Sequence, residues 1–287
     1  MAQIINGKRI AQIIRKKLKK KVEEFKKTKK ITPGLAVILV GNNQASKIYV
    51  RLKEKACQEA GIHFEKYLFP RISQKKLIDL IQKLNKKRKI HGIIVQLPLP
   101  KYLNPDKIIE IIKPEKDVDG FHPENIKKLF QNKPFIIPPL IQSINKLLQS
   151  CPEDLKNKKA LIMANSKTFA LPLKKILEKN QIKAEVYLQP PKSKKITAQK
   201  SQKADILITA LGRPNFINQK MVKKNSIIID AGFTRLKGKI LGDVDLEKVK
   251  SKIKYISPVP GGVGPMTIAM LLTNLLKLAK KQSSKLP

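Results

Sequence analysis

Short apolar runs and longer amphipathic stretches alternate along this chain of 287 residues. The run from Gly34 to Gly41 is almost wholly apolar, which is typical of a strand buried on both faces. A stretch with the spacing of an amphipathic helix follows it. The pattern predicts strands near 34–41, 66–69, 92–96, 160–163, 184–188, 205–210 and 226–230, and helices near 7–28, 45–60, 73–87, 169–180 and 263–281.

Strands that alternate with helices indicate right-handed βαβ crossovers and mostly parallel sheets. The rhythm of strands stops near 120–150, where helical patterns take over, so we expect a domain hinge there. The sequence therefore predicts an α/β protein of two lobes around a cleft.

The formal net charge of +40 raises the question of nucleic-acid binding. Of the 61 basic residues only seven are Arg, and the Lys residues are spread along nearly every predicted helix. Recognition of bases and phosphates favours clustered Arg with exposed aromatic residues, whereas aromatic residues make up only 5% of this chain. A basic nucleic-acid-binding protein stays an alternative, and we expect no specific nucleic-acid partner. The positive field would still attract anionic substrates.

Two cysteines, Cys57 and Cys151, are too few for a disulfide framework, and the three histidines show no metal-like spacing with them. No apolar run approaches the roughly 20 residues that a membrane span needs. We therefore expect a cytosolic protein with no metal and no membrane partner.

Ligands of open parallel sheets bind beyond the carboxyl ends of the strands. That rule selects the loops after Val40, Val95, Met163 and Ser257. After Val40, Tyr49 and Lys53 are four residues apart, so they share a helix face, and a lysine near a helix N-terminus has a lowered pKa that suits proton transfer. Lysine is so abundant here that the pair alone is weak support for catalysis.

Two further segments carry polar candidates. Gln96 ends a buried strand before the rigid Leu97–Pro100, and is either a strand cap or a site residue. Asp117 and Asp119 flank Val118 in a turn-rich stretch without enough neighbours for a metal site. They are either solvated loop acids or carboxylates that bind the donor edge of a heterocycle.

The segment from Ser257 to Thr267 holds three glycines and three prolines, and a long helix follows it. Backbone that approaches a ligand closely beside a helix N-terminus is suited to anionic groups. A purely structural turn would not need so many special residues, so we expect a ligand here.

Together these segments, in this order and spacing, resemble the bifunctional methylenetetrahydrofolate dehydrogenase/methenyltetrahydrofolate cyclohydrolase family. The resemblance covers roughly 5–281. Its motifs are Ser46, Tyr49-Val50, Lys53 and Lys55-Ala56; Gln96 to Pro100; Lys116 to Gly120; and Pro258 to Thr267.

The resemblance implies a catalytic folate-binding lobe (1–138, completed by the helix at 263–287) and a Rossmann-type NADP-binding lobe (139–262). It implies Lys53 as the proton-transfer group of the cyclohydrolase, tuned by Gln96, with Tyr49 packed on the aminobenzoyl ring and Asp119 bonded to the pterin. It places the turn formed by Pro260, Gly261 and Gly262 against folate. It also implies a homodimer.

The departures from the family gather in the nucleotide lobe. Where the family has Gly-Arg-Ser, this chain has Ala164-Asn165-Ser166, so the Arg expected at the 2′-phosphate of NADP is absent. Ala170 replaces a second glycine of the family, and the residues near Gln189–Lys192 replace its Cys-His-Ser loop. The family's Val-Gly-Ile-Asn is replaced by the residues from Ala231 to Thr234, which place Phe233 at the cofactor position. At the hinge, the residues from Pro138 to Ile141 replace the family's Pro-Cys-Thr-Pro. Lys127 replaces a further glycine of the family.

Three explanations stay open for these departures. The enzyme uses NADP weakly or through substitute lysines such as Lys167; it has changed toward NAD; or it has lost the dehydrogenase and kept the cyclohydrolase. A further alternative is a non-catalytic relative that serves as a structural dimer. Convergence of Lys53, Gln96 and Asp119 in one cleft would contradict it.

Overall fold

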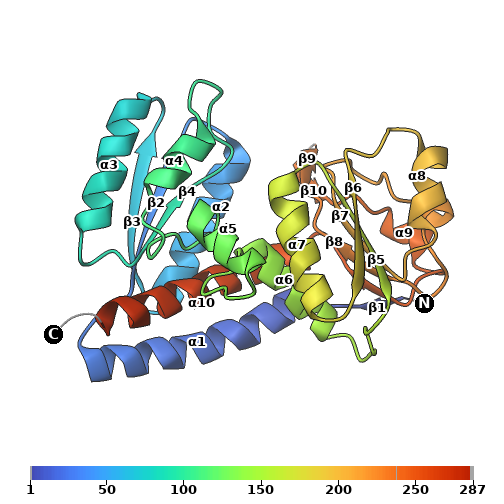
Figure 1. Ribbon diagram of the computed structural model, residues 1–287, viewed down its shortest axis with the longest axis horizontal. Helices are drawn as coiled ribbons and strands as arrows, with labels where there is room; N and C mark the ends of the chain where they lie inside the picture. Colours follow the sequence, from blue (N-terminus) through green and yellow to red (C-terminus); the bar gives the residue numbers. More distant parts are fainter. Residues whose placement is uncertain (1, 237, 285–287) are drawn as a thin grey trace. The chain divides into compact units, whose positions relative to one another are not determined.

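The computed structural model describes residues 2–236 and 238–284 and has the expected α/β architecture with mostly parallel sheets. The chain divides into two compact units. The three-strand unit comprises residues 12–139 and 268–287, and the six-strand unit comprises 1–11 and 140–267. Figure 1 shows both units as sheets covered by helices.

The three-strand unit is built on a parallel sheet in the order β3-β2-β4. Its elements are β2 (Gly34–Val40), α2 (Gln44–Glu59), β3 (His63–Phe69), α3 (Gln74–Lys86), β4 (Gly92–Val95), α4 (Pro105–Ile111), α5 (Pro123–Phe130) and most of α1 (Gly7–Lys29) and α10 (Val263–Ser283).

Every residue of the central strand β2 is buried because helices cover both faces of the sheet. Leu35, Val37 and Leu39 pack in one cluster with side chains of α1, α2 and α10. Ala36, Ile38 and Val40 point the other way, into a cluster with α3 and α4. Alternate residues of a strand face opposite sides, so a continuous apolar run is what this position requires.

The six-strand unit is built on a parallel sheet in the order β1-β11-β8-β7-β5-β6. Its strands are β1 (Gln3–Ile4), β5 (Lys159–Ala164), β6 (Lys183–Leu188), β7 (Ile206–Ala210), β8 (Ile227–Asp230) and β11 (Tyr255–Ser257), with a separate antiparallel hairpin of β9 (Thr234–Leu236) and β10 (Lys239–Leu241). Its helices are α6 (Pro139–Gln149), α7 (Lys167–Lys179), α8 (Lys194–Ser201), the short 3₁₀ helix η1 (Gln219–Met221) and α9 (Leu246–Val249).

The predicted strands are all present, and one begins earlier than expected. Strand β3 begins at His63 rather than near Lys66. It is an edge strand that starts with exposed His63 and half-buried Glu65, so its first residues form no continuous apolar run that the sequence pattern could reveal. The sequence pattern did not reveal β1, β11, the β9–β10 hairpin or α8, which are too short or too polar for a periodic signal.

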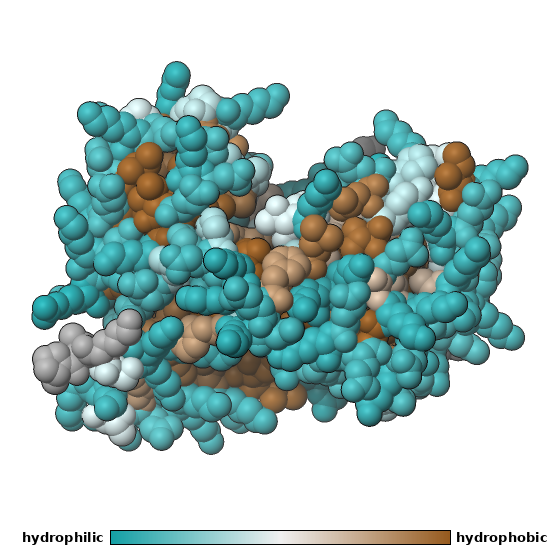
Figure 2. Space-filling view, viewed as in Figure 1, coloured by the Kyte–Doolittle hydropathy of each residue, from teal (hydrophilic) through white to brown (hydrophobic). Residues whose placement is uncertain are grey.

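The surface agrees with the dispersed distribution of lysine. Figure 2 shows hydrophilic residues over most of the visible face, with hydrophobic residues in separate patches. Among the described residues, no helix combines the length and apolar character that crossing a membrane demands.

Candidate active site

The carboxyl ends of β2 and β4 adjoin in the three-strand sheet. The chain leaves β2, forms β3 on one side, and returns to form β4 on the other side. Such a switch in strand order opens a crevice at the carboxyl edge of the sheet. Helix α2 begins there, with the side chain of Asn43 accepting a hydrogen bond from the Ser46 amide at 2.9 Å. The start of α2 and the residues after β4 therefore lie at the same edge of the sheet.

Lys53 and Gln96 meet at this edge. Lys53 lies on α2 with only 8% of its surface exposed, and its Nζ donates to Gln96 Oε1 at 2.6 Å. Gln96 follows β4 directly, its backbone amide donates to the Ile38 carbonyl at 2.8 Å, and its Nε2 donates to the Leu97 carbonyl at 2.8 Å. Both ends of the amide are therefore oriented, with the oxygen toward Lys53.

Burial lowers the pKa of Lys53, because a charged ammonium loses its hydration inside the protein. The negative charge of Asp119 and the neighbouring Cys57 oppose this shift. Burial also raises the pKa of Asp119 to about 6, although the positive charge of Lys53 works against the rise. The two groups thus interact electrostatically, and each is moved toward its neutral form by burial.

The turn that carries Asp119 is held by Asp117. The Asp117 carboxylate accepts from the Gly120 amide at 3.0 Å, the His122 amide at 2.8 Å and Asn125 Nδ2 at 2.9 Å. On the other side, Asn274 of α10 donates to the Val118 carbonyl at 3.1 Å. The two acids therefore differ in their environment: Asp117 is bonded to the backbone of its own turn, whereas Asp119 acts on Lys53.

Lys116, the first residue of the same motif, has a structural contact. Its buried Nζ donates to the carbonyls of Leu84 at 3.0 Å and Lys87 at 2.9 Å, which lie at the C-terminal end of α3. A cation at a helix C-terminus satisfies carbonyls that have no helical partner.

Tyr49 lies one turn before Lys53 on α2 and is half-buried. Burial raises the pKa of its hydroxyl, so the phenol stays neutral well above physiological pH. A half-buried, neutral ring beside a buried lysine is suited to pack on an aromatic substrate.

In the six-strand unit, the corresponding switch in strand order lies between β5 and β7, whose last residues Ala164 and Ala210 are paired. Asn165 and Ser166 follow β5 and are exposed, and Asn165 Nδ2 donates to the Leu211 carbonyl at 2.7 Å. Ser166 is the N-cap residue of α7 but makes no side-chain cap bond. The amides and hydroxyl at this helix start are therefore of the kind that holds a phosphate group.

The two alanines that replace family glycines do not block this edge. Ala164 and Ala170 are both fully buried, and neither has a positive φ. Their methyl groups therefore lie in the core of the unit, away from the exposed Asn165 and Ser166. The residues at the end of β5 fit a bound dinucleotide.

Two buried carboxylates hold the neighbouring loops. Asp243 accepts from the amides of Leu211 at 2.6 Å and Arg213 at 2.7 Å, and Asp230 accepts from the amides of Gly232 at 2.9 Å and Val244 at 3.0 Å. A Cβ on Gly232 would lie 2.3 Å from Asp243 Cγ, so glycine is required there. Exposed Phe233 follows this glycine in the loop after β8. Burial raises the pKa of both acids, that of Asp230 to about 6.

The segment after β11 is closely packed within the six-strand unit. The Lys8 amide donates to the Gly261 carbonyl at 2.8 Å, and a Cβ on Gly262 would lie 2.1 Å from Ser257 Oγ. That buried hydroxyl has no partner among the described residues. Pro260 and Gly261 stay partly open to solvent at the start of α10.

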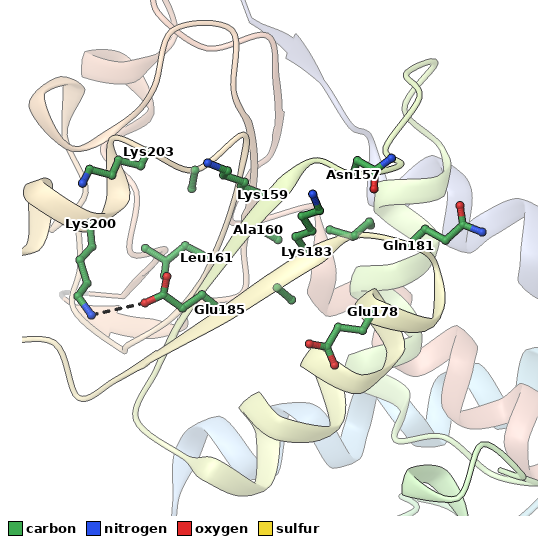
Figure 3. Close-up of a pocket in the computed structure, with 13 residues that line it drawn as sticks. Asn157, Lys159, Ala160, Leu161, Glu178, Gln181, Lys183, Glu185, Lys200 and Lys203 are labelled. Atoms are coloured by element: carbon green, nitrogen blue, oxygen red, sulfur yellow. Dashed lines mark hydrogen bonds and ion pairs between the residues drawn. The ribbon is translucent and has the colours of Figure 1, made fainter.

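A cavity of about 770 Å³ lies elsewhere, at the beginning of β5 and β6 (Figure 3). Lys159, Lys183 and Glu185 line it, and Lys200 forms an ion pair with Glu185. It lies at the amino end of the strands, whereas ligands of such sheets bind at the carboxyl end. We therefore place the chemistry at the two switches in strand order. No group of three or more potential metal ligands occurs within residues 2–236 and 238–284.

Comparison with known proteins decides the family. The family model for the catalytic domain of tetrahydrofolate dehydrogenase/cyclohydrolase matches residues 5–119, and the model for its NAD(P)-binding domain matches 138–283. The chain belongs to the tetrahydrofolate dehydrogenase/cyclohydrolase family. The resemblance expected from the motifs is thereby confirmed.

Individual relatives agree along the full length. The bifunctional protein FolD of Nitratiruptor sp. is 43% identical over 281 residues, which cover 98% of this chain and 99% of that protein. The crystal structure of the bifunctional FolD of Campylobacter jejuni has a TM-score of 0.92 at 42% identity, covering 98% and 100% of the two chains. The Trypanosoma brucei FolD, whose structure contains NADP and an inhibitor, has a TM-score of 0.93 at 30% identity, covering 98% of each chain.

The residues that hold the site residues in place carry no recognisable motif in the sequence. The sequence predicts Asp117 as a solvated or substrate-binding acid, whereas the structure shows it bonded to its own turn, and no pattern points to Asn125, Asn274, Asp230 or Asp243. Their signal is weak: Asn274 is a lone amide in an apolar helix, and Asp243 follows a glycine after a short strand.

Proposed function

We propose that this chain oxidises methylenetetrahydrofolate to methenyltetrahydrofolate with NADP and hydrolyses the product to formyltetrahydrofolate. The observation that carries the proposal is the hydrogen bond of 2.6 Å between buried Lys53 and half-buried Gln96. It lies in a chain whose two halves match the catalytic and NAD(P)-binding domains of this family.

In the hydrolytic step, Lys53 is the proton-transfer group. A water molecule adds to the methenyl carbon, and neutral Lys53 accepts the proton that the water loses. The proton of the resulting hydroxyl then moves to the ring nitrogen as the carbon–nitrogen bond breaks, which leaves the formyl group. Burial lowers the pKa of Lys53 and so favours the neutral form that accepts a proton.

Gln96 orients this lysine through its amide oxygen without adding a charge that would stabilise the ammonium form. Asp119 accepts hydrogen bonds from the pterin, and Tyr49 packs on the aminobenzoyl ring. We also assign Pro260, Gly261 and Gly262 to folate binding. The half-buried positions of Tyr49 and Asp119 support these roles.

NADP, when bound, supplies the hydride acceptor for the dehydrogenase step. Ser166 and the first amides of α7 would hold its phosphates, with Asn165 and Phe233 exposed at the same carboxyl edge and Ala164 buried beneath it. Since the alanines face the core, nothing in the nucleotide edge favours a protein limited to the cyclohydrolase.

We also propose that the protein acts as a homodimer in the cytosol. Both cysteines, Cys57 and Cys151, are free and buried, as is usual in a reducing compartment. Light scattering on the purified protein at micromolar concentration tests the dimer, for which twice the chain mass is expected.

A spectrophotometric assay tests the two activities separately. With methylenetetrahydrofolate, reduced nucleotide is expected to form with NADP and, more slowly, with NAD. With added methenyltetrahydrofolate, its absorbance is expected to decay without any nucleotide. Decay of the methenyl substrate without nucleotide reduction would leave only the cyclohydrolase, and absence of both reactions would overturn the proposal.

A further inference from the structure

The loop after β6 lacks the usual acid of an NAD site. In dinucleotide-binding folds, an Asp or Glu near the end of the second strand binds the ribose hydroxyls of NAD, whereas a nearby cation accommodates the 2′-phosphate of NADP. In this chain β6 is the second strand of the nucleotide sheet, and the segment from Gln189 to Lys195 contains three lysines and no acid. The segment would therefore attract a 2′-phosphate rather than repel it.

Arg213 is fixed beside this loop. Its Nη1 donates to the carbonyls of Pro190 at 2.7 Å and Pro191 at 3.3 Å, and its backbone amide donates to Asp243. Its guanidinium carbon lies 5.2 Å from the centre of the Phe216 ring. The guanidinium is thus positioned by the loop after β6 and by one aromatic face, on a backbone that Asp243 holds, and little of its freedom remains to be lost on binding.

The remaining donors of this guanidinium are open. In the described part of the chain, Nε and Nη2 of Arg213 have no hydrogen-bond partner, and the side chain forms no ion pair. Lys194 Nζ lies 5.9 Å from the centre of the same Phe216 ring, so a second cation flanks the loop. A planar group with free donors beside another positive charge matches a phosphate dianion.

Asn165 does not supply this charge. Its amide nitrogen donates to the Leu211 carbonyl, and its side chain is neutral. Lys167 is exposed at the first position of α7, after β5, where the pyrophosphate rather than the ribose is bound in such folds. Arg213 therefore has the better position for the ribose end of the nucleotide.

We propose that Arg213 binds the 2′-phosphate of NADP and sets the preference of this chain for NADP over NAD. The inference rests on the proposed dehydrogenase function, and it assigns to a residue of the β7 loop the role that the family resemblance gives to the position of Asn165.

Calorimetric titration of the full-length protein tests it with two ligand pairs, NADP with NAD and 2′,5′-ADP with 5′-AMP. Arg213→Gln is expected to raise the Kd of the two 2′-phosphorylated ligands about 10- to 100-fold, as for loss of a charge-assisted contact. The Kd of NAD and 5′-AMP should change less than about threefold because they lack that phosphate. Arg213→Lys should fall between wild type and Arg213→Gln.

Two further variants serve as comparisons. Lys167→Gln tests the rival lysine and should leave the preference for the 2′-phosphate intact. Lys203→Gln, in the cavity at the amino end of the strands, is the matched control for loss of one positive charge. Melting temperatures show whether each variant is folded.

Equal weakening of all four ligands in Arg213→Gln would mean that the residue only supports the loop, and would overturn the inference. An unchanged preference in that variant, or its loss in Lys167→Gln, would overturn it too. The inference is also overturned if the wild-type protein binds 2′,5′-ADP no better than 5′-AMP, whatever the result of the dehydrogenase assay. Selective binding without turnover contradicts the proposed function alone.

Discussion

Each unit has a switch in strand order at the carboxyl edge of its parallel sheet, between β2 and β4 in one unit and between β5 and β7 in the other. The two sites are equivalent in the fold but are built from different residues. The first joins a buried lysine to an amide oxygen at 2.6 Å, next to an acid that acts on its charge. The second presents Asn165 and Ser166, which are exposed and uncharged, with backbone amides around them.

The difference explains where this chain departs from its family. Proton transfer needs particular side chains with shifted pKa values, so the first place depends on the identities of Lys53, Gln96 and Asp119. Phosphate binding relies on backbone amides and on positive charge, which several sequences can provide. The substitutions relative to the family therefore gather at the carboxyl ends of β5 and β7, where hydrogen-bond donors suited to phosphate are still present.

The largest effect is expected from Lys53→Met. Loss of the proton-transfer group should lower the cyclohydrolase rate by about 10²- to 10⁴-fold. Nucleotide affinity should stay unchanged, because the amides and loops that bind it belong to the other unit. Decay of methenyltetrahydrofolate and NADP titration measure the two quantities. Lys55→Met, an exposed lysine of the same helix, is the control, and equal loss in both variants would remove the special role of Lys53.

Asp119 should contribute to the acid limb of the rate profile, together with Lys53, which must be neutral to accept a proton. Its pKa is raised to about 6, so the carboxylate is ionised above that pH and protonated below it. The rate should then fall up to about tenfold per unit of pH below 6, since a protonated acid no longer accepts from the pterin. Asp119→Asn should lower the plateau and flatten this limb, whereas Asp79→Asn, at an exposed position of α3, should keep the wild-type profile. An acid limb that is unchanged in Asp119→Asn would show that Asp119 does not contribute to it.

A smaller, directional effect is expected from Gln96→Glu. A carboxylate opposite Lys53 stabilises the ammonium form and raises its pKa, so the profile should move to higher pH by about one to two units. At neutral pH the rate should fall about tenfold or more. Gln82→Glu, at an exposed position of α3, adds the same charge as a control. Movement to lower pH would contradict the proposed tuning.

The smallest effect on ligand binding is expected from Ala164→Gly. Because the methyl group faces the core, restoring the family glycine should change the Kd of NADP less than about threefold and cost about 1 kcal/mol of unfolding free energy. Denaturant unfolding and calorimetry measure the two effects, with Ala170→Gly as a second buried site. A tenfold gain in NADP affinity would show instead that the alanine hinders the nucleotide.

Much of the fold was predictable because its strands are buried on both faces. Continuous apolar runs such as Gly34–Val40 signal such strands directly, and the rule of binding at carboxyl ends then selects the right loops. The site residues were harder to select, since a Tyr–Lys pair is common in a chain with this much lysine. Only their combination with Gln96 and the motif around Asp119 made them stand out.

By itself the sequence determined the α/β class, the positions of the central strands and the membership of the family, because these depend on local periodicity and on residue identity. The tertiary structure decided the rest. Which of two neighbouring acids acts on Lys53, whether Ala164 faces the core or the edge, and which arginine stands beside the β6 loop all depend on contacts between distant segments. Such contacts depend on the order of strands in each sheet, and the sequence of a single segment does not specify which distant segments it will contact.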